Sequence, residues 1–155
     1  TEEELDRIMS TGTPQRHANR MVLVQFLYMM EMNPPLVLEE EVRNFFENQD
    51  NPREYYGFAE EVLAGILAEL EAIDAKIHIL ATNWEFDRIA KTDLAILRLG
   101  IFEMLYREDV PPVVVIDEAV ELSREFSSDQ SNAFINGILD NVMQDVDRDH
   151  REKLT

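Results

Sequence analysis

The stretch TDLAILRLGIFEMLYR, residues 92–107, carries apolar side chains at almost every position. A helix at a protein surface is apolar along one stripe, whereas a helix that is apolar all round is buried. We therefore predict that residues 92–107 form a central helix on which its neighbours pack, with Thr92 or Asp93 capping its start. The apolar positions are Leu94, Ile96, Leu97, Leu99, Ile101, Phe102, Met104, Leu105 and Tyr106.

Two more helices are predicted after the central helix. Residues 113–116 would suit a strand by their β-branched content, yet apolar residues continue at helical spacing and Pro112 suits a first helical position. Residues 127–130, SSDQ, have the form of a capping box in which Gln130 reaches back to Ser127. Gly137 costs the last helix about 1 kcal/mol relative to alanine, so we expect a neighbouring backbone to pass close to it.

The residues before the central helix are also predicted to be helical. The spacing of apolar residues indicates a three-helix unit: residues 14–33, residues 36–48, and a third helix that starts at Asn51 and Pro52 and breaks near Ala72. Trp84 lies in the joint between the two halves. The predicted division is a flexible acidic segment over residues 1–13, an N-terminal helical subdomain over 14–82, a C-terminal helical subdomain over 83–147 and a charged tail over 148–155.

Composition limits the functions open to this all-α chain. Its 155 residues include no cysteine, which excludes disulfides, thiolate metal sites and cysteine nucleophiles. No segment approaches the roughly 20 apolar residues that cross a bilayer, and no signal-like segment is present, so we expect a cytoplasmic protein. The formal net charge of −18 repels nucleic acid at long range and favours basic partners.

The residue patterns of common active sites are absent from the sequence. His17, His78 and His150 do not form a metal-binding pair, and the five glycines form no Gly-x-Gly cluster for a nucleotide. Asp117, Glu118 and Glu121 cluster near a helix start. Carboxylates there are better explained by a favourable interaction with the helix dipole than by a catalytic acid–base pair. We therefore predict a protein that is not an enzyme and that uses no metal or other cofactor.

Binding residues are easier to find. Arg16, His17 and Arg20 gather at the start of the first helix, and the spacing of Arg16 and Arg20 puts both on one face. Phe134, in the first turns of the last helix, suits stacking on a nucleobase. The alternatives are ordinary solvated cations and a core phenylalanine.

Several motifs together resemble the NusB family of transcription antitermination factors. The likeness is specific over residues 83–142, good over 16–31 and weak between 36 and 80. The motifs are Trp84 with Arg88, residues 93–99, 102–105, 109–111, 116–122 and 134–140, and residues 24–28 in the first helix.

The resemblance implies two three-helix subdomains packed roughly perpendicular, with about seven helices in all. It implies a protein that is not an enzyme and that pairs with a small-subunit ribosomal protein. Together the two proteins would hold a single-stranded boxA element of ribosomal RNA within the RNA polymerase antitermination complex. A homodimer is also possible in such folds.

The resemblance also implies roles for individual residues. Arg16, His17 and Arg20 would contact phosphates, Phe134 would stack on a base and Gln130 would lie beside it. Tyr28 and Asp93 would face the ribosomal protein, with Asp93 near RNA as well. Three further positions, Glu103, Trp84 and Gly137, would be structural.

Two departures from the family pattern leave alternatives open. Ala18 and Asn19 interrupt the usual arginine run, and Leu94 stands where a basic residue is common. One alternative is therefore a scaffold that kept the protein partner and lost RNA binding. Another is a detached fragment of an RNA methyltransferase, although the chain has no glycine loop for a methyl donor.

Overall fold

The structure is a computed structural model that describes residues 2, 13–83 and 85–154, with side chains up to residue 146. Most of the predicted acidic N-terminal segment, and Trp84, lie outside these residues. The described part contains helices and no strand, so the all-α prediction is confirmed. The α-helices are α2 (Pro14–Met32), α3 (Leu38–Glu47), α4 (Gly57–Ala68), α5 (Leu70–Leu80), α6 (Lys91–Tyr106), α7 (Pro112–Phe126) and α8 (Asp129–Leu154), and the short 3-10 helices are η1 (Arg53–Tyr56) and η2 (Phe86–Arg88).

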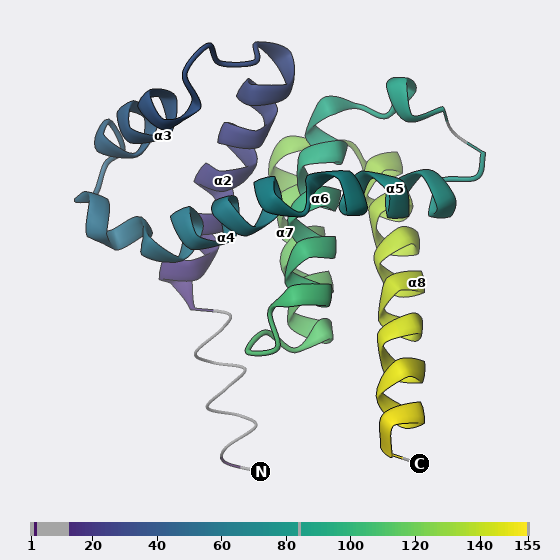
Figure 1. Cartoon of the computed structure of the whole chain (residues 1–155). Coiled ribbons are helices and arrows are strands. Elements are labelled where there is room, and N and C mark those ends of the chain that lie inside the picture. The colour runs from purple at the N-terminus through teal and green to yellow at the C-terminus, as the bar shows by residue number, and fades with distance from the viewer. Residues whose placement is uncertain (1, 3–12, 84, 155) are drawn as a thin grey trace.

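Helix α6 is the centre of the molecule, as its sequence predicts. All twelve residues from 93 to 104 are buried, and α6 contacts α2, α4, α5, α7 and α8. In Figure 1, α6, α7 and α8 run side by side up and down the molecule, while α4 and α5 run across them. The apolar circumference of α6 is thus explained by neighbours on every side.

Ion pairs fix how α2 lies on α6. Arg20 near the start of α2 pairs with Glu103 near the end of α6, whereas Glu31 at the end of α2 pairs with Arg98 and reaches Lys91. The two helices are therefore antiparallel. The start of α2 meets the end of α6, and the end of α2 meets the start of α6.

Two helix boundaries in the first half differ from the prediction. The long periodic stretch divides at Glu69, between α4 and α5, and not near Ala72. Asn51 does not cap an α-helix, because Pro52 leads into η1 and Asn51 bonds to the Tyr56 hydroxyl. At the other end of the chain, α8 continues through residues 148–154, which the sequence assigns to a charged tail.

Two predicted helix caps are wrong for a shared reason. Helix α6 starts at Lys91, after Ala90, which places Asp93 inside the first turn. Helix α8 is capped by Ser128, whose hydroxyl accepts the amide hydrogen of Ser131, and not by Ser127. Instead of capping a helix, the two side chains bond to each other. The Ser127 hydroxyl, just after α7, donates a hydrogen bond to the Asp93 carboxylate on α6.

Close packing requires glycine at positions 65 and 100, and not at position 137 as the sequence predicts. A Cβ at Gly65 would lie 2.1 Å from Cζ of Phe102, and a Cβ at Gly100 would lie 3.0 Å from the δ-carbons of Leu139. A Cβ at Gly137 would have no heavy atom of a neighbouring element within 4 Å among the described residues. The expected close backbone at Gly137 is therefore wrong.

This difference predicts opposite effects of alanine at two glycines. Gly137→Ala should raise the free energy of unfolding by up to about 1 kcal/mol, because alanine is the better helix former and has room. Gly65→Ala should lower it by about 1–3 kcal/mol, because the methyl group forces the buried Phe102 ring to move. Urea unfolding followed by circular dichroism measures both. Equal effects of the two substitutions would contradict this account.

Candidate RNA- and protein-binding sites

Arg20 is buried and paired, although the sequence predicts it as a phosphate contact. Its side chain is 1% exposed, and its Nε and Nη2 donate to the two carboxylate oxygens of Glu103 at 2.8 and 2.9 Å. Glu118 lies 3.8 Å from Nη1. Charge is costly to bury without such partners, so this pair ties α2 to α6. A phosphate would reach Arg20 only if the pair opened.

Arg16 and His17 are more accessible than Arg20, and both contact carboxylates. Arg16 Nη1 lies 3.1 Å from Oδ2 of Asp109, with 22% of the arginine side chain exposed. His17 Nδ1 and Glu118 Oε2 form a 2.7 Å hydrogen bond. The start of α2 therefore meets the α6–α7 turn and α7, and the positive charge of Arg16 is largely neutralised there.

A phenylalanine ring gathers three arginines at this end of the molecule. The guanidinium carbons of Arg16, Arg20 and Arg107 lie 4.3, 5.1 and 5.3 Å from the centre of the Phe58 ring. Such cation–π contacts hold the guanidinium groups in place. Sequence reasoning misses Phe58 and Arg107, since both lie far from residues 16–20 along the chain.

Asp109 is the carboxylate shared by two of these arginines. Partial burial raises its pKa, but hydrogen bonds from Arg107 and Arg16, together with their charges, outweigh burial and hold the pKa of Asp109 below its usual value. Hydrogen bonds to Asp109 likewise raise the pKa of Arg107. The Asp109 carboxylate is therefore charged near neutral pH and competes with any phosphate for Arg16.

The second group of predicted residues lines one pocket between the starts of α6 and α8. This α6–α8 pocket has a volume of about 210 Å³. Gln130 is exposed and Phe134 is half-buried, while Asp93 is 6% exposed and accepts hydrogen bonds from Ser127 and Ser131, both at 2.8 Å. The lining residues are Arg88, Ile89, Ala90, Asp93, Ser128, Gln130, Ser131 and Phe134.

Arg88 adds a cation to this pocket. Its side chain is 77% exposed and lies 3.5 Å from an equally exposed Glu85, a pairing that contributes little in water. The sequence places Arg88 only in a family motif and gives it no role. A half-buried ring, an amide and an exposed guanidinium around one hollow are suited to a nucleobase and its phosphate.

The predicted residues thus form two groups at opposite ends of α6. Asp93 and Glu103 are ten residues apart, which corresponds to roughly 15 Å along a helix. Tyr28, which is 38% exposed, lies one turn before Glu31, the residue that reaches Lys91. The antiparallel packing of α2 on α6 therefore brings Tyr28 toward the end of α6 that carries Asp93, as a shared protein interface would require.

The described residues contain neither a metal-binding cluster nor a membrane-spanning helix. Within the described part of the chain, no three His, Asp or Glu side chains come together in a way that would hold a metal ion. No helix in the described ranges is both long enough and apolar enough to span a bilayer.

The fold and the two groups of residues define a class: a small all-α protein with guanidinium, amide and aromatic side chains near the two ends of its central helix. A model of the NusB family matches residues 17–144, and the chain belongs to this family. The family is one of transcription antitermination factors, which are not enzymes.

Similar proteins cover most of the chain. The transcription antitermination protein NusB of Methylacidiphilum infernorum (isolate V4) is 41% identical over 133 residues, which are 86% of this chain and 93% of that protein. NusB of Nitratidesulfovibrio vulgaris (strain DP4) is 40% identical over 134 residues, covering 83% and 88%.

Solved structures show the same fold. T. maritima NusB superposes with a TM-score of 0.76 at 28% identity, covering 85% of this chain and 92% of that one. A crystal structure of antitermination factors NusB and NusE in complex with dsRNA gives a TM-score of 0.72 over 84% and 96% of the two chains. At 22% identity, this second likeness concerns the fold alone.

Proposed function

We propose that this chain is a transcription antitermination factor that binds boxA-type single-stranded RNA of ribosomal RNA transcripts together with a small-subunit ribosomal protein. It would act in the cytoplasm, within the RNA polymerase antitermination complex, and would catalyse no reaction. Relatives at about 40% identity carry the name of transcription antitermination protein, which supports this function.

The observation that carries the RNA-binding part is the α6–α8 pocket. Gln130 and Phe134 come from the start of α8, Asp93 comes from α6 and Arg88 from η2, yet all line one hollow. Stacking on Phe134 would hold a base whatever its identity, while Gln130 offers both a donor and an acceptor to a base edge. Arg88 would pair with a neighbouring phosphate.

The protein partner is expected to be needed for tight RNA binding. Arg16, His17 and Arg20 all contact carboxylates, and the chain carries a net charge of −18. Each phosphate contact contributes to RNA affinity. Because these side chains already contact carboxylates, we expect the free protein to bind RNA weakly. A basic ribosomal protein would be attracted by the acidic surface and would supply the missing positive charge.

The test is fluorescence anisotropy of a labelled boxA-like RNA, titrated with this protein with and without the ribosomal protein at two salt concentrations. We expect tight, salt-sensitive binding only in the presence of both proteins. Equal RNA affinity with and without the partner would overturn the partner requirement. A stable protein complex that binds no RNA would favour the alternative, a scaffold that kept its partner and lost RNA binding.

A further inference from the structure

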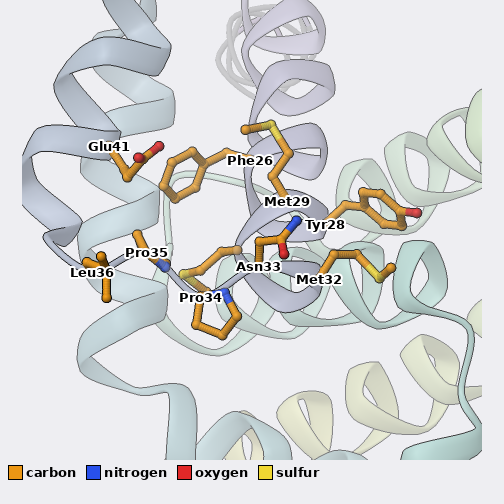
Figure 2. A pocket seen from close by; sticks show the side chains of 10 residues that line it. Phe26, Tyr28, Met29, Met32, Asn33, Pro34, Pro35, Leu36 and Glu41 are labelled. Atoms are coloured by element: carbon orange, nitrogen blue, oxygen red, sulfur yellow. The ribbon is translucent and has the colours of Figure 1, made fainter.

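Two hollows formed by the described residues differ in the chemistry of their walls. The hollow at the end of α2 has a volume of about 410 Å³, and Figure 2 shows mostly apolar side chains around it, among them Phe26, Met29 and Pro34. The α6–α8 pocket is smaller, at about 210 Å³, but a buried carboxylate, that of Asp93, lines it. A nucleobase is recognised by hydrogen bonds to its edge. Of the two hollows, the α6–α8 pocket is therefore the one with a buried acceptor suited to reading a base.

Serine hydroxyls hold both carboxylate oxygens of Asp93. Ser127 donates to Oδ1 and Ser131 donates to Oδ2, each at 2.8 Å, and Ser128 donates in turn to the Ser131 hydroxyl at 3.2 Å. Within the described part of the chain, no lysine or arginine pairs with Asp93. One hydrogen bond to each oxygen fixes the rotation of the carboxylate about the last bond of its side chain.

The carboxylate of Asp93 has acceptor sites beyond those that the serines use. An ionised carboxylate offers about four lone-pair sites on its two oxygens, and the serines occupy one on each oxygen. Asp93 is only 6% exposed, and a buried charge is costly unless donors surround it. A ligand that enters the pocket with two neighbouring N–H groups would supply those donors.

We propose that Ser127 and Ser131 are positioning residues, which hold Asp93 so that the α6–α8 pocket selects guanine over uracil. This selection rests on the proposed function, since RNA must enter the pocket. The Watson–Crick edge of guanine carries a ring N–H and an amino group side by side, which match the two oxygens of a carboxylate as a guanidinium does. Uracil carries one N–H between two carbonyl oxygens, which a carboxylate repels. Adenine and cytosine each offer one amino group, so we expect intermediate affinity for them.

Ser127 acts through Asp93 and does not contact the base. It lies just after α7 and is not among the residues that line the pocket. Its backbone is extended, with φ −135° and ψ −172°, a conformation that β-branched residues favour. Ser127→Thr therefore keeps the hydroxyl and Ser127→Ala removes it, and both leave the residues that line the pocket unchanged.

The test is fluorescence anisotropy with labelled boxA-like RNAs in which each position in turn carries guanine or uracil, titrated with the full chain and the ribosomal protein. At one position we expect guanine to bind about tenfold more tightly than uracil, a discrimination typical of a bidentate contact. Ser127→Ala and Ser131→Ala should each move this ratio toward one, whereas Ser127→Thr should preserve it. Asn141→Ala, an exposed change on α8 outside the pocket, is the matched control and should also preserve it.

The ratio of two dissociation constants separates positioning from folding. Both RNAs are measured on the same protein, so partial unfolding of a variant raises both apparent Kd values alike and leaves their ratio unchanged. The two alanine variants are independent, so if one fails to fold, the other decides.

The outcomes also separate this inference from the proposed function. If the wild-type complex binds RNA but favours guanine at no position, or if the folded alanine variants keep the wild-type ratios, the serines do not set base selection. The inference is then wrong and the proposed function stands. If the wild-type complex binds none of these RNAs, the pocket is not an RNA site and both proposals are wrong.

Discussion

Replacing Arg20 by methionine should lower the free energy of unfolding by about 3–5 kcal/mol, because it leaves a buried carboxylate without its partner. Glu103 is 1% exposed, so water cannot replace the guanidinium. The measurement is urea unfolding followed by circular dichroism. Methionine keeps much of the arginine volume, so the expected loss reflects charge more than packing.

Two further variants distinguish the contribution of the Arg20–Glu103 pair from the cost of leaving one buried charge unpaired. Arg20→Met combined with Glu103→Leu should recover most of the loss, since apolar replacements for both partners of a buried pair are often neutral or stabilising. Arg53→Gln breaks an ion pair with Glu60 whose side chains are 43% and 27% exposed, and it should cost less than about 1 kcal/mol. If Arg20→Met cost no more than Arg53→Gln, the buried pair would not hold α2 on α6.

This result bears on how RNA-binding data are interpreted. Arg20 is hydrogen-bonded to Glu103 in the folded protein. Weaker RNA binding by an Arg20 variant could therefore result from a lost RNA contact or from a less stable fold, and the two causes could not be separated. Arg16 carries no such ambiguity, because its ion pair with Asp109 is partly exposed. Arg16 is therefore the better residue for testing phosphate contact.

The sequence predicts the fold well where the physics is local. The continuous apolar run of α6 indicates burial without any knowledge of its neighbours. The spacing after Pro112 gives a helix despite its β-branched residues, and α7 confirms it. Helical periodicity and proline positions depend only on nearby residues, which the chain order already supplies.

The candidate sites are less predictable because their contacts are distant in sequence. Arg20 and Glu103 are 83 residues apart, and His17 and Glu118 are 101 apart. The spacing of Arg16 and Arg20 correctly suggests a shared face, since both lie over Phe58, but it cannot tell which of them that face buries. The sequence likewise predicts Ser127 as a helix cap, but in the structure its hydroxyl donates a hydrogen bond to Asp93.

One signal in the sequence does point to these partners. Arg98 and Glu103 lie within the otherwise apolar run of α6, and a charge on a buried helix must be paired. Hydrogen bonds and charges from Asp74 and Glu31 outweigh burial and keep the pKa of Arg98 above its usual value. Arg98 and Glu103 therefore mark where α5 and α2 pack on α6. The sequence predicts that each has an oppositely charged partner, but it does not show which residue that partner is.

RNA binding by the complex should depend most strongly on Phe134 in the α6–α8 pocket. Phe134→Leu should weaken binding by about 1–3 kcal/mol, the typical contribution of one stacked base. Leucine keeps an apolar group against the core, where Phe134 is partly buried, so folding should be preserved and circular dichroism should confirm it. An unchanged RNA affinity would show that Phe134 serves the core alone.

Arg16 and Asp109 should have opposite effects in the same anisotropy assay. Arg16→Gln should weaken binding of all RNA sequences alike and reduce the salt slope by about one. Asp109→Asn should tighten binding and steepen the slope, because it removes the carboxylate that holds Arg16 and Arg107. Arg43→Gln, an exposed change on α3, controls for net charge. If Asp109→Asn left both affinity and slope unchanged, the arginines at the start of α2 would not contact RNA phosphates, and the α6–α8 pocket would have to hold the RNA without them.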